Sequence, residues 1–212
     1  MRNFPIAPEA LPFVLLLGAL GTGAWFLDLQ IASLILTILA GWVVWFFRNP
    51  TRTIPDDPRS IVAPADGRVM EISEEEETTY CKERVTRVSI FLNIFDVHIN
   101  RIPCSGEVRE TGFTSGRYLA AMKPAASQVN HRHAILIRTP SGRQMLVVQI
   151  VGLIARRIRC WVKTGDQVTR GDRFGLIQFG SRVDTFLPLD VKLRVKVGDH
   201  VKGGSSILGE FS

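Results

Sequence analysis

The stretch from Leu11 to Phe47 contains a single ionisable residue, Asp28, which separates two apolar runs. A helix needs roughly 20 apolar residues to cross a bilayer. Both runs, Leu11–Leu27 and Leu29–Phe47, approach that length. The sequence therefore predicts two apolar helices, and residues 1–48 are predicted to form a membrane anchor.

The basic residues around this stretch indicate how it lies in the membrane. Arg2 precedes the two runs, and Arg48 and Arg52 follow them. Because cytoplasmic flanks are enriched in Lys and Arg, a spanning hairpin would place both of its ends in the cytoplasm. A pair of helices that dips into one leaflet is the alternative, and the run lengths favour the spanning hairpin. A cleaved signal peptide is not indicated, because a second apolar run follows the first.

Residues 49–60 contain three prolines and are predicted to be a linker, and residues 61–212 are predicted to form one mainly β domain. The acidic run Glu74–Glu77 is predicted to be a solvated hairpin tip, and Tyr118–Met122 to be one helical turn. Strands are predicted where β-branched and apolar residues alternate or cluster: Arg68–Ile72, Val85–Ile94, Val108–Phe113, Ala134–Arg138 and Met145–Val151.

An internal repeat occupies the last third of the chain. The pattern that begins Val162-Lys163-x-Gly165-Asp166 recurs from Val195 at a constant offset of 33 residues. A strand, a Gly-Asp turn and a second short strand are typical of a β-hairpin. Two such copies predict a folded-over sheet with pseudo-symmetry, like the sandwiched half-barrels of lipoyl and biotinyl domains.

Composition narrows the classes of protein. The formal net charge of +6 suits an anionic membrane surface, and no basic-aromatic motif supports nucleic-acid binding. The three cysteines are widely spaced and form no Cys-x-x-Cys pair, so neither a disulfide framework nor a zinc site is indicated. We expect reduced thiols and no metal.

The pair Gly180-Ser181 lies between two strand-like runs, and a glycine there often marks a bulge or a close backbone approach. In a strained turn the Ser181 hydroxyl would attack the Gly180 carbonyl. Elimination from the resulting ester would cut the chain, and hydrolysis would leave a pyruvoyl group, an electron sink. Gly204-Ser205 is a rival pair, but a cut there would leave only residues 205–212.

The letters around this pair resemble the processing region of the short, archaeal-type class of phosphatidylserine decarboxylase proenzymes. The resemblance covers roughly residues 40–212. It rests on four separated segments: Ala63-Pro64-Ala65-Asp66-Gly67, Phe95 to Pro103, Gly152-Leu153-Ile154-Ala155-Arg156-Arg157-Ile158, and Lys163 to Asp184.

The resemblance implies an enzyme of phospholipid biosynthesis that converts phosphatidylserine to phosphatidylethanolamine and carbon dioxide. The substrate would form a Schiff base with a pyruvoyl group derived from Ser181. Self-cleavage would yield a large chain, 1–180, and a small chain, 181–212, which stay together as a heterodimer; a higher oligomer stays open. The enzyme would act at the inner cell membrane with its catalytic domain on the cytoplasmic side.

The resemblance also implies catalytic residues. Asp66 matches the acidic residue that assists self-processing, and His98 matches a proton-transfer residue. Longer members have a second histidine where this chain has Arg101, which cannot act as a base at neutral pH. His98 is therefore expected to serve both reactions.

Four polar residues are weaker candidates for binding substrate. Arg156 and Arg157 would clamp a phosphate or carboxylate, because guanidinium groups suit both. Asn130 and Arg132 lie where the family has Asn-Glu-Arg.

Two other functions remain open at this point. A non-enzymatic, lipoyl- or biotinyl-like membrane adaptor would carry a modified Lys192 and an uncut chain. A pyruvoyl decarboxylase of a soluble amino acid would be cut but would not need an apolar N-terminus.

Overall fold

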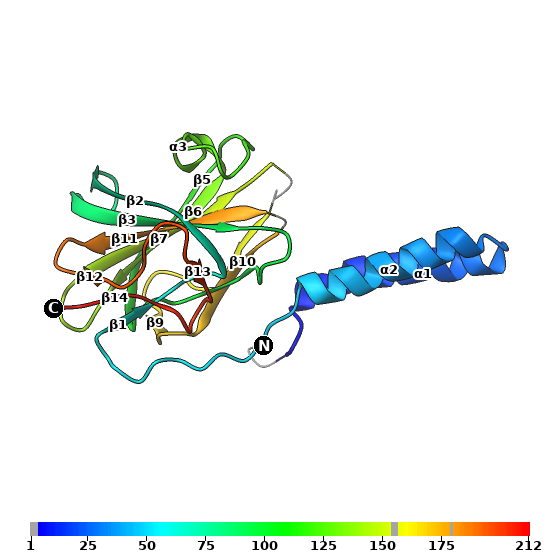
Figure 1. Cartoon of the computed structure of the whole chain (residues 1–212), viewed down its shortest axis with the longest axis horizontal. Coiled ribbons are helices and arrows are strands. Elements are labelled where there is room, and N and C mark those ends of the chain that lie inside the picture. The colour runs from blue at the N-terminus through cyan, green and yellow to red at the C-terminus, as the bar shows by residue number, and fades with distance from the viewer. Residues whose placement is uncertain (1–3, 154–156, 179) are drawn as a thin grey trace. The chain divides into compact units, whose positions relative to one another are not determined.

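The computed structural model describes residues 4–153, 157–178 and 180–212. The chain forms two compact units, Met1–Thr51 and Arg52–Ser212. The first is helical and the second is mainly β (Figure 1).

The N-terminal unit is a pair of apolar helices. A short 3₁₀ turn, η1 (Pro8–Ala10), leads into α1 (Leu11–Phe26), and α2 (Gln30–Phe46) runs back beside it (Figure 1). Asp28 has φ 58° in the connection between them. The segment Pro8–Phe26 is long and apolar enough to cross a membrane, and α2 is a shorter apolar helix of 17 residues. The two predicted runs are thus two helices.

The second unit contains an eight-stranded sheet in which every neighbouring pair is antiparallel. Its strand order is β13-β2-β3-β11-β7-β6-β5-β9. The strands are β13 (His200–Val201), β2 (Gly67–Glu77), β3 (Glu83–Leu92), β11 (Ser181–Pro188), β7 (Gln144–Val151), β6 (Arg132–Arg138), β5 (Gly106–Thr114) and β9 (Gln167–Val168).

Two three-stranded sheets accompany the large one. The first has the order β1-β14-β12 and the second the order β4-β10-β8. Their strands are β1 (Ser60–Val62), β14 (Ile207–Glu210), β12 (Lys192–Leu193), β4 (Ile99–Arg101), β10 (Arg173–Ile177) and β8 (Ile158–Cys160). The mainly β fold class is confirmed.

Both faces of the large sheet are buried around β11. Val183 and Leu187 belong to the main apolar core, which also takes Ile61, Ile102 and Leu208 from outside the large sheet. Phe186 packs in a second cluster with alternate residues of β6 and β7. Because side chains alternate across a strand, β11 separates the two clusters and has no exposed face.

The two repeat copies have matching local geometry. Gly165 and Gly198 both have positive φ, 92° and 100°. In each copy an aspartate accepts a hydrogen bond from a lysine N–H at 3.0 Å. The copies do not close local hairpins, however, because β9 pairs with β5 and β13 pairs with β2. Each copy instead borders one edge of the large sheet.

Two local predictions differ from the structure. Glu74–Glu77 is not a hairpin tip but the end of β2, paired with β3 out to Glu83, and the turn lies beyond Glu77. Two arginines of β3 pair with acidic side chains there, Arg84 with Glu74 and Arg87 with Glu75. Tyr118–Met122 is not helical; the short helix nearby is α3 (Ala126–Val129).

Candidate active site

Ser181 is the first residue of β11, at the end of a strand in the middle of the large sheet. It pairs with Leu92 of β3 on one side and with Val151 of β7 on the other. The side chain is fully buried. Its Oγ atom has no hydrogen-bond partner in the described part of the chain. A buried hydroxyl without a partner costs free energy. The backbone pairing of Ser181 with both flanking strands keeps the residue in this position despite that cost.

Gly180, which precedes it, has a left-handed backbone with φ 69°. Residues with a Cβ atom rarely adopt this conformation, whereas glycine does so at no steric cost. The Gly180 N–H donates a hydrogen bond to Nε2 of His98 at 3.2 Å. The Gly180–Ser181 peptide bond therefore joins a turn residue bonded to His98 to a strand residue paired on both sides in the sheet.

His98 is almost fully buried, with 1% of its surface exposed. Its Nδ1 atom lies 2.9 Å from the carbonyl oxygen of Asp96. Because a carbonyl oxygen can only accept, Nδ1 carries the proton, and Nε2 accepts from Gly180. The imidazole is thus a neutral tautomer whose unprotonated nitrogen faces the turn at Gly180.

Gly152 lies against the carbonyl that would be attacked. A Cβ atom at this position would collide with the carbonyl oxygen of Gly180 and would come within 3.4 Å of the Cβ atom of Ala121. The turn before Ser181 therefore packs directly on the backbone that follows β7. Sequence reasoning placed Gly152 in a family motif without giving it a role.

Sequence reasoning also missed two buried amides. Nε2 of Gln149 donates to Oδ1 of Asn100 at 2.7 Å, and both side chains are fully buried. Nδ2 of Asn100 and Oε1 of Gln149 have no hydrogen-bond partner in the described part of the chain. Gln149 pairs with Val183 of β11, which is two residues from Ser181. Gln149 and Ser181 therefore lie on the same face of the sheet. The only sequence signal for Gln149 was a polar residue inside an apolar strand.

Asp66 lies in the turn before β2 and makes two polar contacts. Oδ2 forms an ion pair with Arg52 at 2.7 Å, and Oδ1 accepts a hydrogen bond from the Gly203 N–H at 2.8 Å. The structure thus brings Gly180, Ser181 and His98 together and directs Asp66 toward Arg52.

Arg101, which replaces the second family histidine, is buried and donates from Nη1 to the Gly171 carbonyl at 2.9 Å. Burial lowers the pKa of its guanidinium to about 10. The group therefore stays protonated at neutral pH, in agreement with the expectation that it is no base.

The four weaker candidates occupy different environments. Asn130 is fully buried, and its amide group bonds Leu119 and Val151 backbone atoms, so it fastens the loop before β6 to the end of β7. Arg132 donates to the Gln128 carbonyl. Arg157 is exposed, and its carbonyl accepts from the Gln178 N–H. Arg156 lies outside the described residues.

A buried charge network lies on the face of β11 opposite to the Ser181 side chain. Arg182 has no exposed surface; its Nε donates to Asp184 at 2.5 Å and its Nη2 to Ser89 at 2.7 Å. Glu71 of β2 lies 3.4 Å from the same guanidinium. Burial raises the pKa of the Asp184 carboxyl, and Arg182 opposes that effect. The network joins β11 to β3 and β2.

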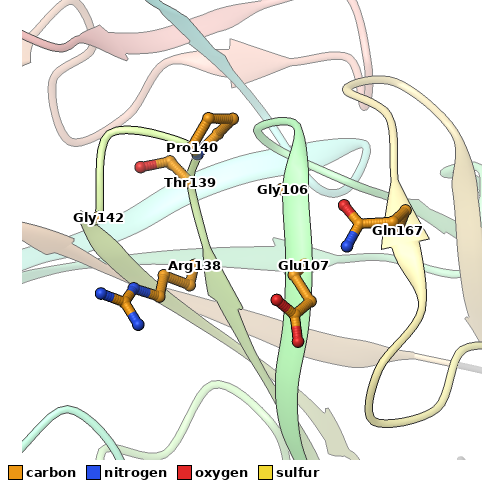
Figure 2. A pocket seen from close by; sticks show the side chains of 7 residues that line it. All are labelled: Gly106, Glu107, Arg138, Thr139, Pro140, Gly142 and Gln167. Carbon is orange, nitrogen blue, oxygen red and sulfur yellow. The ribbon is translucent and has the colours of Figure 1, made fainter.

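Figure 2 shows a pocket at the other end of the sheet, formed where β5 begins and β6 ends, with Gln167 of β9 on its edge. None of the candidate site residues described above lines it. Within residues 4–153, 157–178 and 180–212, no cluster of three His, Cys, Asp or Glu side chains could hold a metal ion. The Gly180-Ser181 pair, with its buried serine, is therefore the stronger candidate site.

The sequence model of the family described as phosphatidylserine decarboxylase matches residues 39–209. The chain belongs to the phosphatidylserine decarboxylase family. The match includes α2 from its middle onward and ends one residue before the last residue of β14, so the family's domain is present with all the site residues named above.

Curated relatives match over nearly their whole length. A phosphatidylserine decarboxylase proenzyme of Syntrophus aciditrophicus is 45% identical, with 97% of each chain covered. Proenzymes of the same name from Symbiobacterium thermophilum and Desulfotalea psychrophila are 44% and 38% identical and cover 100% and 98% of this chain. The phosphatidylserine decarboxylase family consists of carboxy-lyases, and this chain is one of its enzymes.

Proposed function

We propose that this chain is a phosphatidylserine decarboxylase proenzyme that cuts itself between Gly180 and Ser181. One observation carries the proposal: a buried serine hydroxyl, without a hydrogen-bond partner among the described residues, follows a left-handed glycine inside the family's domain. The mature enzyme would convert phosphatidylserine to phosphatidylethanolamine and carbon dioxide.

The cut follows from the chemistry of the turn. Ser181 Oγ adds to the Gly180 carbonyl carbon, the amide C–N bond breaks, and the Ser181 nitrogen takes up the hydroxyl proton, which leaves an ester. A base then removes the α-proton of residue 181, and the Cβ–O bond breaks. This step releases a Gly180 carboxylate and a dehydroalanine, whose hydrolysis yields ammonia and a pyruvoyl group.

Several contacts favour the first step. His98 bonds the N–H of Gly180, and the Gly180 carbonyl oxygen packs closely against Gly152, so we expect the turn to have little freedom to move away from Oγ. Effective molarities of well-oriented groups reach about 10⁵–10⁸ M. Nε2 of His98, which is distant in sequence, accepts a hydrogen bond from the Gly180 N–H, and we assign it the proton transfers.

The pyruvoyl group would supply the electron sink for loss of carbon dioxide. His98 would then return a proton to the substrate carbon, and Asp66, fixed by Arg52 and Gly203, would assist self-processing.

Arg157, on the exposed segment after β7, would attract the lipid phosphate, with Arg156 beside it in the sequence. Asn130 and Arg132 would shape the neighbouring loop.

The two products of the cut would stay together as a heterodimer. The small chain, 181–212, would contain β11, β12, β13 and β14, which occupy the large sheet and one small sheet. Since β11 pairs on both edges and is buried on both faces, the small chain would remain bound without a covalent link.

We also propose the division into an anchor, 1–48, a linker, 49–60, and a catalytic domain, 61–212. The anchor would place the enzyme at the inner cell membrane with its catalytic domain on the cytoplasmic side. The catalytic domain would be a pseudo-symmetric, lipoyl-like half-barrel. The matching turns at Gly165 and Gly198 and the matching positions of β9 and β13 at the two sheet edges support that description.

Replacement of the nucleophile tests the proposal. Ser181→Ala should leave the chain intact, because no hydroxyl remains, whereas Ser205→Ala should be cut normally. A denaturing gel and intact mass should show chains 1–180 and 181–212 in the parent, the latter blocked by pyruvoyl. A free serine amine at residue 181, or a cut elsewhere, would refute the mechanism.

The alternatives make opposite predictions. The adaptor with a modified Lys192 requires an uncut chain with added mass on that residue. The decarboxylase of a soluble amino acid requires a cut chain that releases carbon dioxide from free serine or a similar substrate but not from phosphatidylserine.

A further inference from the structure

We propose that the loops around the processing turn form an apolar rim that docks on the surface of an anionic phospholipid bilayer. The rim consists of Ile94, Phe95, Met122 and Leu153. This inference rests on the proposed function, because the substrate of the enzyme would be a lipid of that bilayer. It adds a second membrane contact, made by the catalytic domain itself.

Two of the loops start beside Ser181. Leu92 and Val151, its partners on β3 and β7, are the last residues of their strands. Phe95 lies three residues beyond the first and Leu153 two residues beyond the second. Both side chains are therefore carried on segments that leave the sheet at the point of cleavage.

The third loop is fastened to the same place. Ala121 packs against Gly152, and the Asn130 amide bonds both the Leu119 carbonyl and the Val151 carbonyl. Met122 follows Ala121 directly. Three segments that are distant in the sequence thus present apolar side chains at one end of the sheet.

The rim residues are exposed although their neighbours are buried. Phe95, Met122 and Leu153 have 62%, 60% and 64% of their surface exposed, and Ile94 has 38%. Leu92, Val151 and Ala121, which precede them, are buried. Clustered exposed apolar side chains usually mark an interaction surface.

The loop that carries Phe95 is shaped by its own polar side chains. Asn93 Oδ1 accepts a hydrogen bond from the Phe95 N–H at 2.7 Å, and Asp96 Oδ2 accepts one from the Asn93 N–H at 2.8 Å. These bonds hold the turn while Ile94 and Phe95 point outward. The exposure of the two side chains is thus a property of an ordered turn.

The charge beside the rim identifies the occupant as an anionic lipid surface. Lys123 follows Met122, Arg157 follows the loop of Leu153, and both are exposed. The carboxylate in the first loop, Asp96, is engaged with Asn93. An apolar group flanked by basic side chains matches the acyl boundary and the anionic head groups of a bilayer. A lipid could then present its head group to the site without leaving the bilayer.

Activity on two forms of one substrate tests the rim in the full chain. The variant Phe95→Ser/Met122→Ser/Leu153→Ser should still cleave itself, because the strand partners of Ser181 are Leu92 and Val151 and none of the three replaced residues. Decarboxylation of phosphatidylserine in vesicles should fall on the order of tenfold, since apolar contact area drives interfacial binding. Decarboxylation of a short-chain phosphatidylserine below its micelle concentration should be unchanged.

Leu189→Ser is the matched control, because Leu189 is 48% exposed and follows the other end of β11. It should change neither activity. An equal loss on both substrates in the rim variant, or no loss on vesicles, would overturn the proposal. Absence of decarboxylation in the parent protein would contradict the proposed function instead.

A label reports docking without any activity. An environment-sensitive fluorophore on Leu153→Cys should shift to the blue when the full chain is reconstituted into vesicles containing anionic lipid, and the same label on Leu189→Cys should not. Burial raises the pKa of Cys81 and Cys104 to about 12 and raises that of Cys160, so the native thiols would label slowly near neutral pH. An unchanged Leu153 label, or one that responds only to an added protein, would exclude a lipid partner.

Discussion

At the scale of residues, the site depends on how few atoms are free to move. The N–H of Gly180 is bonded to His98, its carbonyl oxygen lies on Gly152, and Ser181 is fixed by two strands. A hydroxyl and the carbonyl that precedes it are close in any serine peptide. The structure adds a left-handed glycine and the histidine bonded to it, which would turn a common dipeptide into the proposed site of self-cleavage.

His98 is the residue whose role can be separated most clearly. His98→Ala should lower decarboxylation by about 10²–10⁴-fold, the usual contribution of a general acid or base. It should also slow self-cleavage, because Gly180 loses the acceptor for its N–H. Chain cleavage and carbon dioxide release should be followed in one preparation.

Each outcome of that experiment has a distinct meaning. Normal cleavage with lost turnover would confine His98 to the substrate reaction and leave Asp66 to act with another base. His131→Ala is a suitable control, because His131 bonds the Gly116 N–H on an exposed loop. Full activity of His98→Ala in both assays would show that His98 is only a core side chain.

At the scale of elements, β11 connects chemistry with assembly. Its first residue is the proposed nucleophile, and its next residues carry the buried pair Arg182–Asp184. Buried charges are costly unless they are paired, so this pair fixes β11 between β3 and β7 in one register. The strand would remain the anchor of the small chain after the cut.

Loss of one partner should therefore weaken the assembly. Arg182→Met would leave the Asp184 carboxylate buried without its closest cation, and breaking such pairs typically costs roughly 3–5 kcal/mol. We expect the midpoint of urea unfolding to fall and the small chain to dissociate at lower urea, measured by circular dichroism and gel filtration.

The matched control is Arg194→Met, also in the small chain, because Arg194 and Glu210 form an exposed ion pair. Exposed pairs contribute little, so the unfolding midpoint should barely change. Equal effects of the two substitutions would mean that the buried network does not hold β11.

At the scale of the whole molecule, the chain consists of a helical unit and a β unit, and every proposed catalytic residue belongs to the second. The ion pair of Arg52 with Asp66 also lies within the second unit. The chemistry of self-cleavage is therefore expected to be independent of the first unit.

A fragment of residues 51–212 tests this independence. It should be soluble and should cleave itself, because it retains Arg52 and all three sheets. The measurement is a high-salt wash and ultracentrifugation with bacterial membranes, followed by a denaturing gel, with the full chain as the membrane-bound reference. A fragment that stays uncut, or that remains in the pellet after the wash, would show that the two units are not separable in this way.

Local signals in the sequence predicted much of this molecule. The lengths of the apolar runs predicted α1 and α2, and alternation and β-branching predicted most of the long strands. Such signals succeed because they depend on neighbours in the chain. The same reasoning was wrong for Glu74–Glu77, where cross-strand arginines stabilise an acidic strand.

Tertiary structure alone decided which distant residues meet. His98 and Gly180 are 82 positions apart, and Asn100 and Gln149 are 49 apart. The repeat copies pair with β5 and β2, although their sequence suggested local hairpins. The physical reason is that strand order and register depend on burial of whole faces against each other, which no local pattern specifies. The sequence thus determined the elements and the candidate Gly-Ser dipeptide, whereas the packing of three sheets brought His98 and Gly152 beside it.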